Sequence, residues 1–587
     1  MISRELKMMV GQMLMAGFPG PSGDDPKDGA GKVPEQAQRL LNEYYVGNYI
    51  YFARNIQSAR QCTELSRALS DLVFDRLGVC PIITTDQEGG IVSRLVEGAA
   101  LTPGAAAVGA AVKGLSAKLL ESERTLVDGD QTKALKRIGK AQERAMNAPL
   151  LKVRALGHMS GEILKACGIN TDLAPDMDVN IEPANPIIGS RSYGDNAALV
   201  SKVAIAQMQG LSEGGVLPMI KHFPGHGNVK SDSHLGIPVN DTPEEKLREE
   251  EFSTFRAAVQ QGAQAIMTAH VRYLSVDPEN PATLSRKIMT DMLRDEWGFT
   301  GIVATDCLEM DAIKAAYGCG EGAVRAIEAG VDLLTISHTY AAAKEAAEAI
   351  YAALESGRLS PERIRLSYER IRRIKQMYGL TERQRLNPVF SEELVQSRSR
   401  QIISEELMKD AITLLKGDLK VDLKAGSGAA ADYIVIAFDQ APSSGAEDMR
   451  PLSFADQMAV RYGCPAIPLP LNATDEQVEE GLKRLDAFLT QAEEHRGTAI
   501  SPVPVILGLY NARFRAGQQK LIQALRELAQ NGRIRLAVIL LGAPYDLPLV
   551  EDADCVLTSY EYTRLSVKAL LEAMESGTYP GQSPFAL

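Results

Sequence analysis

The sequence lacks long apolar runs and any excess of basic residues. Its longer apolar runs, such as residues 536–543, fall far short of the roughly 18 residues that a membrane-spanning helix needs. Lys and Arg together number 63 against 75 Asp and Glu, and no basic block stands out. We therefore expect no membrane span, and no nucleic-acid or anionic-membrane partner.

Cysteine is scarce and scattered. The seven cysteines show no C-x-x-C spacing, which argues against a disulfide framework and against a structural zinc site. The N-terminus does not show the ordered basic, apolar and small-residue segments of a signal peptide. These absences favour a reducing, cytoplasmic location, the alternative being export with a leader absent from this chain. The phosphate-binding patterns GxGxxG and GxxxxGK[ST] are also absent.

What the sequence does contain is an alternation of short apolar runs with amphipathic stretches of helical pattern. The runs in the first 340 residues cover 13–18, 48–52, 81–86, 171–179, 217–223, 265–270, 301–306 and 331–337. Strands that alternate with helices indicate parallel β/α units. Eight such units predict a (β/α)8 TIM-type barrel, with a doubly wound open sheet as the alternative.

The 587 residues are too many for one ordinary core. We predict a barrel domain over 1–380, a polar linker over 381–400 and a smaller six-stranded α/β/α sandwich domain over 401–587. An insertion over about 104–148 contains a charged, helical segment that Gly129 interrupts. We expect a solvated insertion there, the alternatives being a lid over the barrel mouth or a dimer arm.

Ionisable residues gather at the predicted carboxyl ends of the barrel strands, where barrel enzymes place their chemistry. Following the strands in order, they are Asp86, Asp172, Asp176, Asp178, Lys221, His222, His270 and Asp306. Five of the seven histidines lie at or just beyond these ends, namely His222, His226, His234, His270 and His338. Together they indicate a polar site, although His338 by itself is expected to be a core histidine.

Two of these positions suit acid–base and nucleophilic chemistry. Asp306 ends a very apolar strand, which suits a rigidly held nucleophile, and the alternative is a structural aspartate that binds backbone amides. Asp232 precedes His234 by two residues and can orient its ring, as a general acid/base requires. His222 and His226 have metal-ligand spacing, but Pro224-Gly225 between them breaks a helix, so we predict no metal site.

Six motifs in order along the first half carry a resemblance to a known family. They are Asp86-Gln87-Glu88-Gly89-Gly90, Ile188-Gly189-Ser190-Arg191-Ser192-Tyr193-Gly194, Lys221-His222-Phe223-Pro224-Gly225-His226-Gly227, Asp232-Ser233-His234, Pro281-Ala282-Thr283-Leu284-Ser285 and Thr305-Asp306. Together they resemble glycoside hydrolase family 3, and Asp232-Ser233-His234 resembles its β-N-acetylglucosaminidase branch. The second half resembles the α/β/α sandwich domain of the two-domain form more loosely.

The resemblance implies a role for each matched residue. Asp306 matches the nucleophile that forms a covalent glycosyl-enzyme, His234 matches the acid/base, and Asp232 matches its partner. The residues that match groups binding the hydroxyls of the terminal sugar are Asp86, Arg94, Arg191, Lys221 and His222. The resemblance implies no cofactor and no metal.

We accordingly expect a retaining exo-β-N-acetylglucosaminidase that removes terminal GlcNAc from muropeptides, as in peptidoglycan recycling, or from chitin oligosaccharides. The partner is then a small carbohydrate, and no oligomeric state is predicted. Within the family the alternatives are a β-glucosidase or β-xylosidase, or a GlcNAc phosphorylase, because a neutral imidazole does not repel phosphate. From another class the alternative is an inactive sugar-binding or wall-sensing protein, against which the joint presence of Asp306, Asp232 and His234 argues.

Overall fold

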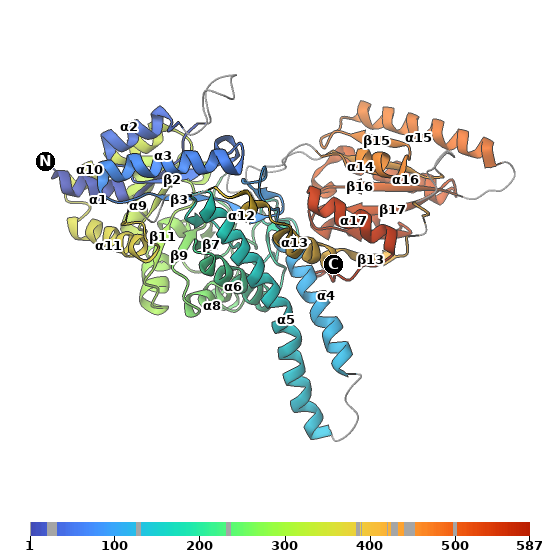
Figure 1. The fold of residues 1–587 in the computed structure, drawn as a ribbon, viewed down its shortest axis with the longest axis horizontal. Coiled ribbons are helices and arrows are strands. Elements are labelled where there is room, and N and C mark those ends of the chain that lie inside the picture. Colours follow the sequence, from blue (N-terminus) through green and yellow to red (C-terminus); the bar gives the residue numbers. More distant parts are fainter. Residues whose placement is uncertain are drawn as a thin grey trace. The chain divides into compact units, whose positions relative to one another are not determined.

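A computed structural model describes residues 2–19, 32–124, 131–230, 236–382, 388, 390–419, 421–423, 432–439, 452–496 and 502–587 (Figure 1). Contacts divide the chain into two compact units. The first comprises Met1–Glu88, Val92–Leu101 and Leu151–Ile403, and the second comprises Gly89–Ile91, Thr102–Leu150 and Ser404–Leu587. None of the helices in these described ranges is long and apolar enough to cross a membrane.

The first unit is built on a parallel eight-stranded sheet. Its strands are β1 (Leu14–Ala16), β2 (Asn48–Tyr51), β3 (Ile82–Thr85), β6 (Thr171–Asp172), β7 (Leu217–Phe223), β9 (Ala265–Thr268), β11 (Ile302–Ala304) and β12 (Leu334–Ile336). Each strand pairs with the next of these in the chain from β1 to β11, and β1 also pairs with β12. A bridge between Ala304 and Leu333 joins β11 to the approach to β12 and closes the ring. The predicted barrel is therefore confirmed, and the open sheet is excluded.

Helices lie between the strands of this barrel and before and after them in the chain. They are α1 (Arg4–Gln12), α2 (Glu35–Tyr44), α3 (Ala59–Leu77), α6 (Ala197–Glu213), α7 (Glu244–Glu249), α8 (Glu251–Gln260), the π-helix η4 (Lys287–Glu296), α9 (Asp311–Ala329), α10 (Tyr340–Glu355), α11 (Pro361–Met377) and α12 (Glu392–Gln396). Local signals set several ends. The Ser58 hydroxyl caps the start of α3, and Gly78 ends it in the left-handed conformation.

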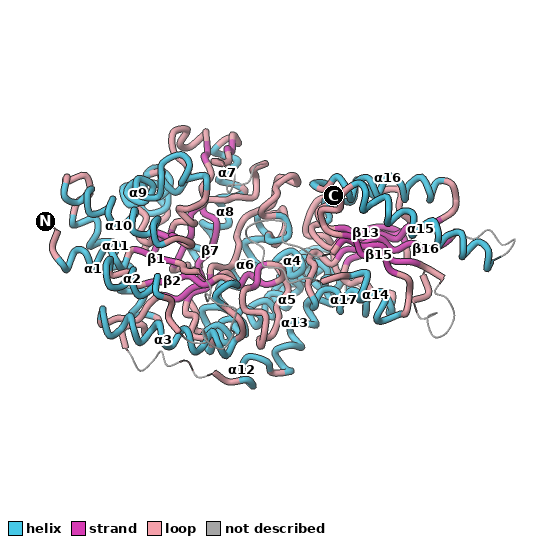
Figure 2. The backbone as a smooth tube through the Cα atoms, turned by 90° about the horizontal axis from the view of Figure 1, so that it is seen from above, coloured by secondary structure: helices cyan, strands magenta, loops and turns pink. Residues whose placement is uncertain are grey.

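The second unit contains a six-stranded sheet with helices on both faces (Figure 2). Its strands are β13 (Thr413–Gly417), β14 (Ile434–Phe438), β15 (Ala466–Leu469), β16 (Val503–Leu509), β17 (Ile534–Leu540) and β18 (Cys555–Thr558). The order is β13-β18-β17-β16-β14-β15, and only the edge strand β13 runs antiparallel to its neighbour. The helices are α13 (Arg398–Ala411), which begins in the first unit, α14 (Phe454–Tyr462), α15 (Asp475–Arg496), α16 (Ala516–Gln530) and α17 (Arg564–Ser576). The predicted sandwich fold is confirmed.

The long insertion packs with the second unit rather than with the barrel domain in which the sequence prediction placed it. It forms α4 (Ala105–Arg124) and the first part of α5 (Gln131–Ala166), while Gly129 lies outside the described residues. The apolar start of α4 is buried, and Lys113 donates to the carbonyl of Ser583 over 2.6 Å. A contact across more than 400 positions leaves no local pattern, so sequence periodicity did not reveal this grouping.

Candidate active site

Strands β3 and β7 bring a carboxylate and a lysine together at the carboxyl end of the barrel. Asp86 follows β3, and its Oδ1 accepts from Lys221 Nζ of β7 over 2.6 Å. Arg94 Nη2 lies 3.4 Å from the other oxygen of Asp86. Burial alone would raise the pKa of Asp86, but the two cations outweigh it and hold the pKa below its usual value. Asp86 is therefore a carboxylate poised to accept hydrogen bonds.

Glu88 links this pair to Arg191, which lies in the 3-10 helix η2 (Gly189–Arg191). Its Oε2 accepts from Arg191 Nε over 2.9 Å, and its Oε1 accepts from Arg191 Nη2 and from Lys221 Nζ, each over 2.7 Å. Burial acts against the charge on Glu88, but Arg191 and Lys221 lower its pKa. The three side chains are about 95% buried or more. One carboxylate thus orients two cations in a dry setting, where charge-assisted hydrogen bonds are strong.

His222 lies beside the same cluster, and Asp178 orients its ring. His222 Nδ1 lies 2.7 Å from Asp178 Oδ2, and the other oxygen of Asp178 accepts from the backbone N–H of His226 over 2.7 Å. An aspartate acceptor at Nδ1 places the ring proton there. The opposite nitrogen, Nε2, then faces Arg191 Nη2 at 3.5 Å. Against the effect of burial, His222 lowers the pKa of Asp178, which favours the ionised form.

Asp176 completes an acidic pair beneath the network. Burial, followed by the neighbouring Asp178, raises its pKa well above the usual value, and its Oδ2 has no hydrogen-bond partner among the residues that the structure describes. Ligand atoms of Asp176, Asp178 and His222 lie within 4.8 Å of one another, a spacing compatible with a metal ion. However, Asp178 and His222 already bind each other, and Arg191 Nη2 lies 3.8 Å from Asp176 Oδ2. A cation would have to compete with both contacts.

Asp306 stands two residues beyond β11 at the same end of the barrel and is half-buried. Its Oδ1 accepts from the N–H of Cys307 over 2.7 Å. His270, which is buried, lies with Nε2 3.1 Å from the Cys307 carbonyl and with Nδ1 2.8 Å from the Thr283 hydroxyl. A carbonyl only accepts, so Nε2 carries the proton and His270 holds the carbonyl of Cys307, the residue after Asp306.

Asp306 acts electrostatically on His226, in the histidine-rich loop after β7. Burial and then His222 lower the pKa of His226 to about 4, while Asp178 and Asp306 oppose them. With its pKa lowered in this way, His226 is an uncharged imidazole at neutral pH.

The structure describes six of the eight predicted site residues. Five form one connected network, and Asp306 lies at the same end of the barrel. The five are Asp86, Arg94, Arg191, Lys221 and His222. The other two residues, Asp232 and His234, lie outside the described residues. The expectation that His338 is a core histidine was wrong, because its side chain is exposed beyond the end of β12.

Sequence reasoning missed the part played by Glu88. The signal was its spacing, because Asp86 and Glu88 stand two positions apart around β4 (Gln87–Gly89), and residues two apart on extended chain point the same way. The orienting role of Asp178 was also missed, although its position at a strand end was noted. Cation partners for these acids come from residues 191 and 221, so only the folded chain pairs them.

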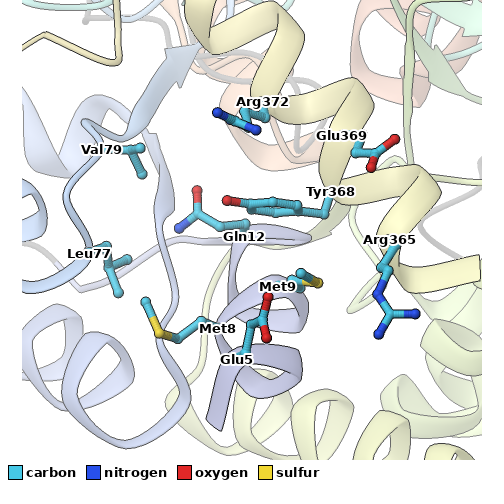
Figure 3. Close-up of a pocket in the computed structure, with 10 residues that line it drawn as sticks. All are labelled: Glu5, Met8, Met9, Gln12, Leu77, Val79, Arg365, Tyr368, Glu369 and Arg372. Carbon is cyan, nitrogen blue, oxygen red and sulfur yellow. The ribbon is translucent and has the colours of Figure 1, made fainter. Parts of the chain in front are cut away.

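A pocket of about 440 Å³ opens elsewhere on the first unit, between α1 and α11 (Figure 3). Gln12 and Val79 line it, and these residues precede β1 and β3, so the pocket lies at the amino-terminal ends of the strands. Figure 3 shows Arg365 and Glu369 directed away from Gln12. This face of a barrel contributes stability rather than chemistry, and the pocket is separate from the candidate site.

Comparison with known proteins identifies the family. Residues 5–374 match the glycosyl hydrolase family 3 N terminal domain. The chain belongs to glycosyl hydrolase family 3. Membership confirms the family resemblance of the six motifs.

Curated relatives of this family member include hexosaminidases. It is 30% identical over 392 residues to beta-hexosaminidase A of Pseudoalteromonas piscicida, and the match covers 62% of this chain and 60% of that protein. It is 29% identical over 336 residues to a beta-hexosaminidase of Nitrosomonas eutropha, covering 57% of this chain and 86% of that one. The chain thus spans less than two thirds of the length of the Pseudoalteromonas protein.

One solved structure matches both units. The family 3 beta-N-acetylglucosaminidase from Paenibacillus sp. str. FPU-7 aligns with a TM-score of 0.81 at 30% identity, covering 100% of this chain and 99% of that one. The predicted fold class, a TIM-type barrel followed by a smaller α/β/α domain, is therefore found in a family member of matching length.

Proposed function

We propose that this chain is a retaining exo-β-N-acetylglucosaminidase that removes terminal GlcNAc from muropeptides or chitin oligosaccharides. The observation that carries the proposal is the buried network of Asp86, Glu88, Lys221, Arg191 and His222 at the end of the barrel where Asp306 lies. Acceptors and donors in fixed positions suit the hydroxyls of one sugar ring. Sequence similarity to hexosaminidases supports the acetamido sugar as substrate.

In the proposed mechanism Asp306 acts as the nucleophile. Its carboxylate oxygen forms a bond to the anomeric carbon as the glycosidic C–O bond breaks, and the departing oxygen takes a proton from the His234 imidazolium. The glycosyl–aspartate ester is then attacked by water, whose proton passes to His234. Two displacements retain the β configuration. The half-buried position of Asp306 and the amide that fixes one of its oxygens suit this role.

Within this mechanism the network binds the ring that is released. Asp86, as a carboxylate, accepts hydroxyl protons, while Lys221 and Arg191 donate to hydroxyl oxygens. His222 has its Nδ1 engaged by Asp178, so Nε2, which lies 3.5 Å from Arg191 Nη2, is the ring nitrogen available to substrate.

A panel of aryl glycosides tests the proposal directly. We expect aryl β-N-acetylglucosaminide to be hydrolysed with a kcat/KM at least roughly 100-fold above those of the glucoside and xyloside. Faster turnover of the glucoside or xyloside would favour the alternative substrates. A rise in rate with added phosphate, together with GlcNAc 1-phosphate as product, would favour a phosphorylase. Binding of GlcNAc without turnover of any glycoside would favour the inactive sugar-binding protein.

The biological setting is part of the same proposal. The cytoplasmic location expected from the cysteine pattern fits a role in peptidoglycan recycling, in which muropeptides are degraded inside the cell. All seven cysteines are buried and free, which is compatible with a reducing environment. Fractionation of cells with a tag at the C-terminus would test the location, and recovery of the protein outside the membrane would overturn it.

A further inference from the structure

The two glycines that end the motif Asp86-Gln87-Glu88-Gly89-Gly90 belong to the second unit. Gly89–Ile91 follows Glu88 directly in the chain, yet it packs with Thr102–Leu150 and Ser404–Leu587. Asp86 and Glu88, a few residues upstream, belong to the charged network described above. The second unit therefore holds the stretch of backbone that is attached to two groups of the proposed sugar site.

Glu561 is the side chain that meets this stretch. Its Oε2 accepts from the N–H of Gly104 over 2.5 Å. A Cβ atom at Gly90 would lie only 2.7 Å from the same oxygen and 2.8 Å from the Cα of Gly104. Gly90 has a φ of +57°, and its N–H donates to the carbonyl of Thr102 over 2.8 Å. Two glycine backbones thus pack against one carboxylate, at a spacing that admits no other residue at Gly90.

Glu561 is itself held firmly by its own unit. It lies between β18 and α17, and its side chain accepts from the Thr563 hydroxyl over 2.7 Å. Its backbone carbonyl accepts from the hydroxyls of Ser559 and Ser566 over 2.8 and 2.9 Å. With 2% exposure, the residue has no freedom to leave the contact.

Burial of the Glu561 carboxyl group costs free energy, and packing alone does not explain why an acid stands there. No lysine, arginine or histidine in the described part of the chain forms an ion pair with Glu561. Burial raises its pKa to about 7, although the Gly104 and Thr563 donors oppose this. A buried acid without a cation destabilises a fold. The benefit of Glu561 is that it supplies an acceptor for the Gly104 N–H. With an apolar side chain in its place, this N–H would have no hydrogen bond.

We infer that Glu561 is a positioning residue, through which the second unit fixes the Gly89–Ile91 turn and so keeps Asp86 and Glu88 in place for sugar binding. This inference rests on the proposed function of those two residues. It assigns the second unit a task in substrate binding that needs no group of its own in the reaction. Loss of the contact should therefore weaken binding of the sugar more than it slows the chemical step.

Kinetics of the full-length protein with Glu561→Ala and Glu561→Gln test the inference. With aryl β-N-acetylglucosaminide we expect Glu561→Ala to raise KM roughly tenfold while kcat stays within about threefold of the unmodified enzyme. Glu561→Gln keeps an oxygen for Gly104 and should recover part of the affinity. Glu575→Gln is the matched control, since Glu575 pairs with Arg461 on the surface of the same unit and should change neither constant.

Amide hydrogen exchange supplies a readout that does not depend on turnover. Peptides covering residues 86–104 should exchange faster in Glu561→Ala than in the unmodified protein and in Glu575→Gln. If the unmodified enzyme cleaves no aryl glycoside, the proposed function fails, and exchange still decides whether Glu561 fixes the turn. Should Glu561→Ala not fold, Gly104→Ala replaces it, because its Cβ would lie 2.9 Å from Glu561 Oε2. Unchanged KM and unchanged exchange in a folded variant would overturn the inference.

Discussion

The two largest sheets among the described residues, the barrel and the six-stranded sheet, are both mainly parallel, and their carboxyl ends differ in chemistry. Those of the barrel carry buried acids and bases that neutralise one another, such as Asp86, Glu88 and Lys221. Those of the second sheet carry hydroxyl groups and aromatic rings, such as Ser559, Tyr560 and Tyr562, and the buried acid among them, Glu561, is bonded to backbone and hydroxyl donors rather than to a cation. Both ends are places where parallel sheets bind ligands. The fold provides a place for a ligand at the carboxyl end of a parallel sheet. The buried ionisable groups at that end provide the chemistry.

Replacement of Asp306 tests the barrel side of this comparison most severely. Asp306→Asn removes the charge that attacks the anomeric carbon but preserves shape, so we expect kcat to fall by roughly 10³-fold or more. Asp311→Asn, five residues further along at the start of α9, is the control and should leave kcat near that of the unmodified enzyme. Circular dichroism checks that both variants fold. An Asp306→Asn protein with normal turnover would refute the nucleophile assignment.

The Asp232–His234 pair tests the same comparison through proton transfer. The proposed mechanism assigns the general acid and base to this pair and to no group of the second unit. His234→Gly should slow aryl glycosides with poor leaving groups by about 10²- to 10⁴-fold and activated ones far less, since an activated group departs without a proton. Asp232→Ala should show a milder form of the same pattern, because the imidazole remains but loses its orienting partner. A series of substituted phenyl glycosides measures this. Equal slowing across the series would mean that His234 only binds substrate.

The sequence predicted the barrel well, because each strand is a short apolar run that ends in polar residues, as in residues 217–223 and 301–306. It also predicted the charged network, because the motifs lie at those ends. It could not reveal that Glu88 joins Lys221 and Arg191, because ion pairs between distant strands leave no local pattern. For the same reason it could not reveal that Glu561 contacts Gly104, 457 positions away.

Glu88 tests whether the charged network depends on its internal pairing. Glu88→Gln removes one negative charge from between Arg191 and Lys221, so we expect KM for the aryl glycoside to rise roughly 10- to 100-fold. Glu213→Gln is the matched control, because Glu213 forms the same two-pronged pair with Arg154 on the surface, where such pairs contribute little. Both variants are compared by steady-state kinetics. A KM unchanged in Glu88→Gln would mean that substrate does not use the oriented cations.

Glu251 extends the comparison from activity to stability. It begins α8 below Gly225, is 1% exposed, and burial followed by Asp178 raises its pKa from 4.5 to about 8. Between these values the folded protein holds a proton that the unfolded chain has released, so the free energy of unfolding falls as pH rises. Glu251→Gln removes that component, and its Tm should decline less between pH 5 and pH 8 than that of the unmodified protein.

The control for this experiment is the exposed Glu245, whose replacement by Gln should leave the slope of Tm against pH unchanged. Differential scanning calorimetry at several pH values measures both. A Glu251→Gln variant whose Tm follows pH as the unmodified protein does would show that Glu251 titrates at an ordinary value. Such a result would remove Glu251 from the set of buried ionisable groups that distinguishes the barrel.

The smallest effect is expected where the second sheet most resembles a site. Asp439 follows β14, and burial raises its pKa; Asp546 accepts from the N–H groups of Ala512 and Arg513 over 2.7 and 3.0 Å. Both are acids near the carboxyl end of a parallel sheet, yet the proposed reaction assigns them no proton. Asp439→Asn and Asp546→Asn should therefore keep kcat within about tenfold of the unmodified enzyme. A lower Tm in either variant would report a loss of stability and not of catalysis. A loss of turnover in either variant that added azide restores would place a catalytic carboxylate in the second unit and break the comparison.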